Sequence, residues 1–199
     1  MPDIAMKKPS VDDERNRWLT AEERDRLIGE CSELVRRHVS FLFWTGARLG
    51  ESFALKWADV KLDAERPHVV LRTRKTRGGK EKKRLVPLRP VVLEVMREQR
   101  VARGKKVGEK DLVFVNGEGG EWERSAFYSH FDKAKEKAKI DDFTPHDCRH
   151  TFATHLIMAG VRERVVAQLL GHSSLALVMR YTHVAPDHMD DVMSMLTAA

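Results

Sequence analysis

Several short segments of the sequence combine side chains that bind or attack phosphate. The run TPHDCRHT, which begins at Thr144, carries His146 and Arg149. Thr144 suits a helix N-cap and Pro145 the first helical position, so the two basic side chains are expected one turn apart at the positive end of a helix. Such an end attracts anions, phosphate above all. The alternative is a capped helix whose arginine pairs with a carboxylate and whose histidine is buried.

Two other segments extend this set. Arg48 follows a glycine bend in the run TGARLGE, and His172 stands in LLGHSS, between two predicted helices. Nine residues after His172 comes Tyr181, one of the two tyrosines of the chain. The other, Tyr128, lies on a predicted helix and is interpreted as ordinary packing. Arginine presents a planar fork to phosphate oxygens and a tyrosine oxygen can attack phosphorus, so these residue types suit phosphoryl transfer.

Helices are the elements expected to position most of these residues. Thr20 and Glu23 have the spacing of a capping box, and apolar residues at helical spacing follow as far as Thr45. The runs 68–73 and 83–88 are rich in β-forming residues and flank the turn RGGK, which predicts a hairpin. A third short strand is predicted at 112–115, and further helices at 48–57, 90–103, 124–138, 145–159, 162–170, 175–181 and 186–196. The predicted fold is mainly α with a small three-stranded antiparallel β-sheet.

The composition is that of a soluble globular protein. The chain has 199 residues, of which 42% are hydrophobic and 33% charged, and this fits one domain or a large one with a small appendage. No apolar run approaches the roughly 18 residues that a membrane span needs, and the start has no signal-peptide core. The two cysteines, Cys31 and Cys148, form no CxxC pair, which argues against a disulfide framework or a structural zinc site. A cytoplasmic, reduced protein is therefore expected.

Positive charge is concentrated in one part of the sequence. The formal net charge is +6, yet residues 72–110 alone hold fifteen Lys or Arg against four Glu. Clustered positive charge is expected of a protein that binds a phosphate backbone. A solvated hairpin that keeps its lysines for solubility is the alternative, and charge alone does not decide between them.

Taken in order along the chain, these segments resemble the tyrosine recombinases of the phage integrase family. The resemblance runs from about Trp18 to His188 and comprises TGxRxxE, a lysine in a β-hairpin ending in VPL, HxxRH, LGH and the tyrosine that follows it. Each string is short and common, whereas the ordered set is highly specific. It implies the catalytic fold of a DNA breaking and rejoining enzyme. By the same resemblance, the catalytic residues are Arg48, Lys75, His146, Arg149, His172 and Tyr181.

The resemblance implies site-specific DNA recombination through a 3′-phosphotyrosine intermediate, and the chemistry of the residues agrees with it. The two arginines would hold non-bridging phosphate oxygens, with a further hydrogen bond from His172. Tyr181 would attack phosphorus after losing its proton, for which His146 is the expected acceptor. Lys75 would protonate the leaving 5′ oxygen. Because the phosphotyrosine retains the energy of the broken bond, no cofactor and no metal are expected.

Several of these assignments have alternatives. Arg48 could pair with Glu51, one turn later, and Glu51 itself is interpreted as orienting its neighbours. His150, the last residue of HxxRH, is expected to support the site rather than react, and Cys148 is expected in the core. The role of Lys75 could instead fall to another lysine of the same hairpin: Lys80, Lys82 or Lys83.

Two other classes of function compete with this one. Residues 161–182 could form a helix-turn-helix DNA-binding module without catalysis, but this leaves Arg48, the basic hairpin and HxxRH unexplained. Nine histidines suggest a metal-dependent nuclease, but the chain has neither HExxH nor a carboxylate pair near them.

The resemblance also predicts an organisation and a set of partners. Residues 1–17 are expected to be a tail or interdomain linker, 18–185 the catalytic domain, and 186–199 a C-terminal helix that is exchanged between protomers or folds back on its own domain. The N-terminal core-binding domain typical of the family is expected to be absent from this chain. The expected partners are double-stranded DNA, other protomers in a tetramer on DNA, and accessory DNA-bending proteins. Once bound to DNA, the protein would be associated with the nucleoid, and no membrane is expected to be involved.

Overall fold

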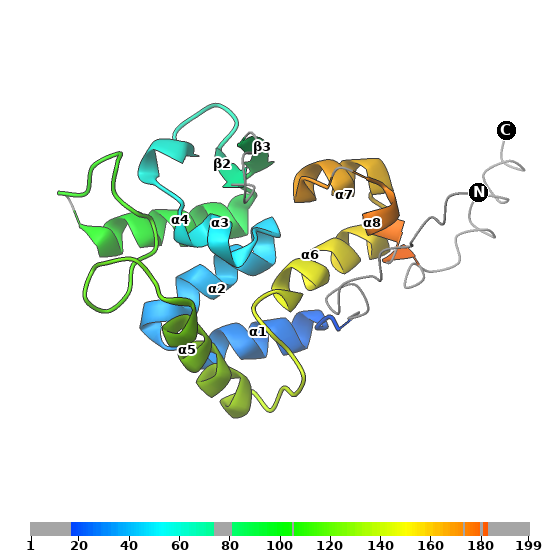
Figure 1. Ribbon diagram of the computed structural model, residues 1–199, viewed down its shortest axis with the longest axis horizontal. Helices are drawn as coiled ribbons and strands as arrows, with labels where there is room; N and C mark the ends of the chain where they lie inside the picture. The colour runs from blue at the N-terminus through cyan, green and yellow to red at the C-terminus, as the bar shows by residue number, and fades with distance from the viewer. Residues whose placement is uncertain (1–16, 74–80, 105, 173, 180, 183–199) are drawn as a thin grey trace, which may run out of the picture.

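In the part that the structure describes, the chain forms eight short to medium helices and one small sheet, which lies at one edge of the molecule (Figure 1). This computed structural model describes residues 17–73, 81–104, 106–172, 174–179 and 181–182. The helices are α1 (Ala21–Glu30), α2 (Glu33–Thr45), α3 (Leu49–Phe53), α4 (Pro90–Arg103), α5 (Arg124–Lys137), α6 (Asp147–Met158), α7 (Glu163–Leu170) and α8 (Ala176–Met179). A 3-10 turn, η2 (Trp57–Asp59), precedes the strands β1 (Val60–Lys61), β2 (His68–Thr73) and β3 (Lys82–Pro87). The predicted fold, mainly α with a three-stranded antiparallel sheet, is confirmed.

Local signals determine where the first two helices begin and end. The backbone N–H of Glu23 donates to Oγ1 of Thr20 at 3.2 Å, and the N–H of Thr20 donates to the Glu23 carboxylate at 3.0 Å. The predicted capping box is therefore confirmed. α2 ends at Thr45, and the next residue, Gly46, has a φ of 60°. Glycine adopts this left-handed conformation at little cost, so the chain turns sharply there and α3 starts just after it, with Arg48 as its N-cap.

α2 is the central helix of the fold. It packs against α4 on one side and α6 on another, while α1 lies beside α5 (Figure 1). Its buried residues occupy most of its circumference, as expected of a helix surrounded by others: Val35, His38, Val39, Ser40, Phe41, Leu42, Phe43 and Thr45. A second, smaller core joins α6, α7 and α8 and includes Tyr181. None of the described helices is long and apolar enough to cross a membrane.

The third strand of the sheet is not the predicted one. The strand order is β1-β2-β3, and the short β1 comes from the segment after η2. The predicted strand at 112–115 forms no more than an isolated bridge, so that prediction is wrong. Val113 and Phe114 are both buried, whereas consecutive strand residues point to opposite faces of a sheet. The carbonyl of Val113 accepts a hydrogen bond from the side chain of Gln99 at 2.7 Å, which takes the place of a strand partner.

Replacing Gly46 by alanine should destabilise the protein. A Cβ atom there would lie 2.5 Å from Cδ1 of Phe152, and the φ of +60° is itself unfavourable for alanine. The expected loss is about 1–3 kcal/mol in the free energy of unfolding, measured by urea denaturation. Gly29, in α1, is the matched control, because a Cβ there meets no atom within 4 Å and alanine should stabilise the helix by about 0.5–1 kcal/mol. Equal unfolding midpoints for the two variants would contradict this account of the bend.

Candidate active site

A buried carboxylate, that of Glu51, lies at the centre of the candidate site. Its side chain is 3% exposed on α3. The carboxylate accepts hydrogen bonds from the backbone N–H and Nη1 of Arg48 at 2.8 and 2.9 Å, and from Nη1 and Nη2 of Arg84 at 2.7 and 2.6 Å. The hydroxyl of Thr73, at the end of β2, also donates to it. Glu51 therefore joins α3 to both strands of the hairpin.

Arg84 is a residue of this site that the sequence analysis missed. It lies on β3 directly opposite Leu71 of β2, and its side chain is 8% exposed. Its Nε donates to the carbonyl of Leu169, near the end of α7, at 2.8 Å. A signal was available, because side chains two apart on a strand share a face and Arg84 therefore shares one with the apolar Val86 and Leu88, both of which the structure buries. An arginine two residues before an inward-facing valine is expected to point inward as well.

The surroundings of Glu51 keep it ionised. Burial by itself raises the pKa of a carboxyl group, because it disfavours the charged form. Here the hydrogen bonds and charge of Arg84, together with the hydrogen bonds from Thr73 and Arg48, outweigh burial and lower the pKa of Glu51 to about 2. The carboxylate therefore carries a full negative charge at neutral pH.

Arg149 is held by backbone carbonyls instead of a carboxylate. It is 2% exposed on α6; its Nη1 donates to the carbonyl of Gly46 at 2.7 Å and its Nη2 to that of Leu170 at 2.6 Å. Burial, and then the neighbouring positive charges of Arg48 and Arg84, lower the pKa of Arg149 to about 9. It is still protonated at neutral pH, and it ties the end of α2 to the end of α7.

The start of α6 differs slightly from the prediction. The helix begins at Asp147 rather than at residue 145, and Thr144 acts as a donor rather than as the capping acceptor. Its N–H and hydroxyl donate to the Asp147 carboxylate at 2.7 and 2.8 Å. His146 stands just before the helix and is exposed. Together with Arg48 it lines a cavity of about 730 Å³, which has ample room for a phosphate group.

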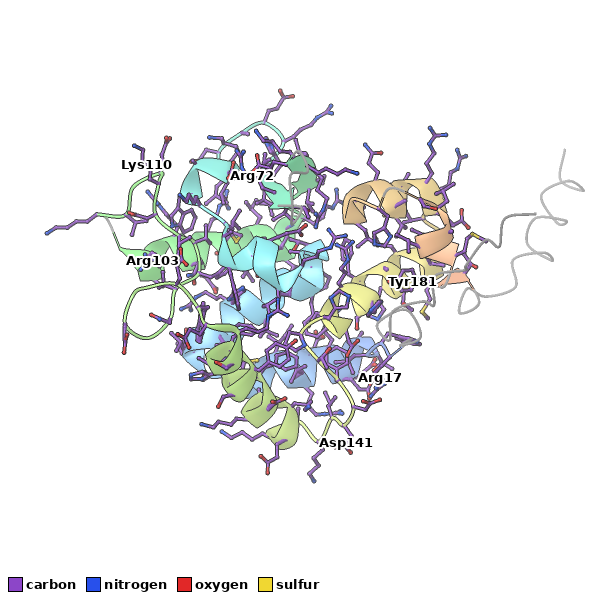
Figure 2. The ribbon with its side chains drawn as sticks, in the orientation of Figure 1. Arg17, Arg72, Arg103, Lys110, Asp141 and Tyr181 are labelled. Carbon is purple, nitrogen blue, oxygen red and sulfur yellow. The ribbon has the colours of Figure 1, made fainter. Side chains whose placement is uncertain are left out.

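Tyr181 is in direct contact with the HxxRH motif. Its hydroxyl lies 2.6 Å from Nδ1 of His150, and each of the two residues is 4% exposed. Figure 2 shows Tyr181 beside α6, on the side of α7 and α8. The ring of His146 lies edge-on to that of His150, with centroids 5.0 Å apart. The structure thus brings the expected nucleophile to His150, a residue that the sequence analysis gave a supporting role.

The remaining expected residues are placed as follows. His172 comes after α7 and borders, with Arg84, a second cavity of about 620 Å³. Cys148 is fully buried and Tyr128 packs against the core, as predicted. Lys75, Lys80 and the segment 186–199 lie outside the described residues. In the described ranges, no three His, Cys, Asp or Glu side chains are grouped so that they could hold a metal ion.

In the described part of residues 72–110, the positive charge is spread over several elements rather than gathered at the candidate site. Arg72 is on β2, where it pairs with two carboxylates. Arg103 ends α4, and Figure 2 places it and Lys110 at the opposite end of the molecule from Tyr181. These described residues divide the charge between the strands of the sheet and a region remote from Tyr181.

Replacing Glu51 by glutamine should destabilise the protein in a pH-dependent way. The change leaves Arg84 buried without its counter-charge, which is expected to cost about 3 kcal/mol at neutral pH. Because the pKa of Glu51 is lowered from 4.5 to about 2 on folding, this stabilisation is complete above about pH 4.5 and is lost as the pH falls toward 2. Urea denaturation of both proteins from pH 7 to pH 3 should show the difference narrowing below about pH 4.5.

The control for this change is Glu33→Gln. Glu33 forms ion pairs with Arg36 and Arg37 but its side chain is 68% exposed, so its loss should cost under about 1 kcal/mol. A Glu51→Gln penalty as small as that of the control would show that the buried pairs do not stabilise the fold.

Comparison with known proteins supports the assignment made from the motifs. Residues 17–188 match the family model described as the phage integrase family. The chain is 36% identical to tyrosine recombinase XerD of Corynebacterium glutamicum over 160 residues, which cover 79% of this chain and 50% of that protein.

Solved structures agree with this result. The crystal structure of XerA recombinase matches with a TM-score of 0.73 at 29% identity, over 92% of this chain and 65% of that one. XerH site-specific recombinase, bound to its difH substrate in a pre-cleavage complex, matches with a TM-score of 0.70 at 25% identity, over 90% of this chain and 54% of that one. The chain therefore spans between half and two thirds of these relatives. Its fold, its ordered motifs and its match over residues 17–188 show that the chain belongs to the phage integrase family of tyrosine recombinases.

Proposed function

We propose that the chain contains the catalytic domain of a site-specific DNA recombinase that cleaves and rejoins double-stranded DNA through a 3′-phosphotyrosine intermediate. The observation that best supports this is the contact between the Tyr181 hydroxyl and His150, on the same helix as Arg149. The DNA substrate bound by the related XerH supports double-stranded DNA as the substrate class.

In the proposed reaction, the oxygen of Tyr181 attacks the scissile phosphorus and forms the new P–O bond, while the 5′ oxygen of the next nucleotide leaves. Negative charge then builds up on the non-bridging oxygens and needs cations already in position. Arg48 suits this role because its side chain is 35% exposed and lines the larger cavity. Arg149, held by the carbonyls of Gly46 and Leu170, adds a second positive charge near Arg48, and His172 would supply a further hydrogen bond.

The phenol proton of Tyr181 needs an acceptor, because an unperturbed tyrosine has a pKa of about 10. His146 was the acceptor expected from the sequence. The Tyr181 hydroxyl lies 2.6 Å from Nδ1 of His150, which can accept the proton in the tautomer that carries its hydrogen on Nε2. This distance supports our assignment of the first proton transfer to His150. His146, exposed beside the same cavity as Arg48, then faces the phosphate.

The leaving 5′ oxygen takes up a proton, for which we keep Lys75 as the proposed donor. Thr73, the last residue of β2 and two residues before Lys75 in the sequence, donates a hydrogen bond to Glu51, so β2 ends at the centre of the site. Rejoining reverses the chemistry: a 5′ hydroxyl attacks the phosphotyrosine and releases Tyr181. The ester retains the bond energy, so the proposal includes no cofactor.

The same proposal covers the organisation of the protein. Residues 18–185 would form the catalytic domain, 1–17 a linker and 186–199 a segment exchanged with a neighbouring protomer. Recombination joins four DNA ends, so we include further protomers and accessory DNA-bending proteins among the partners.

Tyr181→Phe should abolish the covalent protein–DNA adduct while leaving the fold intact, because it removes the attacking oxygen alone. The wild-type protein is incubated with a randomised library of nicked duplexes, and DNA that stays attached to protein in a denaturing gel is sequenced and used as the substrate. Tyr128→Phe, which changes the other tyrosine of the chain, should still form the adduct. An adduct with Tyr181→Phe, or no adduct with wild type on any duplex, would refute the proposed function.

His150→Ala should slow formation of the adduct by about 100-fold, the usual contribution of a general base. Incorporating a ring-fluorinated tyrosine at position 181 lowers the pKa of the phenol. This should restore much of the lost rate, because a more acidic phenol can give its proton to water, a weaker base than the histidine. The same fluorinated residue should not restore His146→Ala, if His146 acts on the phosphate. Rescue of His146→Ala but not of His150→Ala would return the acceptor role to His146.

A further inference from the structure

Arg84 is a buried cation that has no role in the reaction as proposed. Its side chain is 8% exposed, and all three of its guanidinium nitrogens are engaged by the protein. Nη1 and Nη2 donate to the two oxygens of Glu51, and Nε donates to the carbonyl of Leu169. A guanidinium so enclosed is poorly placed to bind a phosphate oxygen. Its effect on the reaction must therefore pass through its partners.

The first of these partners is the carboxylate that Arg84 shares with Arg48. A single negative charge on Glu51 cannot neutralise two guanidinium groups. Arg84 binds it through two nitrogens and is 8% exposed, whereas Arg48 binds it through Nη1 and is 35% exposed. The deeper pair is less screened by water, so Arg84 takes up most of the charge. Arg48 is left as a cation at the cavity; without Arg84 it would become the principal counter-ion of Glu51.

The second partner is the end of α7. The last carbonyls of a helix have no partner within it and lie at the negative end of its dipole, where a cation is favourable. The carbonyl of Leu169 accepts from Nε of Arg84 at 2.8 Å. Gly171 follows with a φ of +67°, and a Cβ there would lie 3.0 Å from Cδ of Arg84. The close passage of Arg84 thus fixes the turn that leads into His172.

We infer that Arg84 is a positioning residue for phosphoryl transfer: it takes up the charge of Glu51, so that Arg48 meets the scissile phosphate as a full cation, and it holds the end of α7 that carries His172. This inference rests on the proposed recombinase function. It differs from a merely structural role in one respect, since it makes the effect of Arg84 depend on the charge of the phosphate.

That dependence can be measured with the full chain and the nicked duplex that wild type selects. Arg84→Gln should form the adduct about 100-fold more slowly than wild type, as for the loss of one preorganised group that stabilises the transition state. The comparison is repeated with a methylphosphonate at the scissile position, in which a methyl group replaces one non-bridging oxygen and removes the charge. On the methylphosphonate, the ratio of the wild-type rate to the Arg84→Gln rate should fall to about 10 or less, because an uncharged linkage depends less on the positive charge of Arg48.

A second variant tests the link through Glu51. Adding Glu51→Gln to Arg84→Gln removes the carboxylate that would otherwise capture Arg48. The double variant should form the adduct at least about 10-fold faster than Arg84→Gln alone, although it lacks more native contacts. Arg84→Lys keeps a cation beside Glu51 and is the variant most certain to fold; it should be slowed less than Arg84→Gln and show the same dependence on phosphate charge.

The controls separate this inference from the function on which it rests. Arg36→Gln removes an arginine that is 44% exposed on α2 and should leave the rate unchanged. The inference would be overturned if the ratio of the wild-type rate to the variant rate were the same on the charged and the uncharged linkage, for either Arg84→Gln or Arg84→Lys. It would also be overturned if the double variant formed the adduct no faster than Arg84→Gln. Each of these results requires a wild-type adduct, so the recombinase proposal would survive them. No adduct with wild type would instead refute the proposed function itself.

Discussion

The structure depends on the burial of one carboxylate among several donors. Glu51 is reached from α3 by Arg48, from β2 by Thr73 and from β3 by Arg84. A buried charge is tolerated when it is paired and fully hydrogen-bonded, and is very costly when one partner is missing. The three segments are therefore obliged to meet in one arrangement. Because two of them, β2 and β3, are neighbouring strands, the same carboxylate also fixes the sheet against α3.

The two buried arginines are held by different means, and this matters for the proposed reaction, in which the site would bind a negatively charged phosphate. Arg149 is anchored by the carbonyls of Gly46 and Leu170, which orient it without neutralising it. Arg84 is anchored by the carboxylate of Glu51, which does neutralise it. A site built from carboxylate-bound arginines alone would offer little net charge to a phosphate. With both kinds of anchor, Arg84 fixes the geometry through its ion pair with Glu51, while Arg48 and Arg149 retain positive charge for the phosphate.

Much of this architecture could be predicted from the sequence, because its signals are local. The capping box at Thr20, the bend at Gly46 and the hairpin each follow from a few neighbouring residues, and the structure has all three. The strand at 112–115 was mispredicted because an apolar run indicates burial without saying whether its backbone pairs. The inward direction of Arg84 was readable from strand alternation, but not its partners, since Glu51 lies 33 residues away in the chain. Contacts of that range arise from the packing of elements, which no local pattern encodes.

The enclosure of Tyr181 has a consequence for how DNA sequences would be told apart. Its hydroxyl lies 2.6 Å from Nδ1 of His150 and the residue is 4% exposed, so the oxygen faces the protein interior. In the proposed reaction the oxygen would have to leave that position to reach phosphorus, and part of the free energy of DNA binding would go into the rearrangement. A duplex that contacts the protein through its phosphate backbone alone would bind, but it would supply little additional free energy to drive this rearrangement. Discrimination between a correct and an incorrect site would then be larger in the rate of cleavage than in the affinity, and an incorrect duplex could be held without being cut.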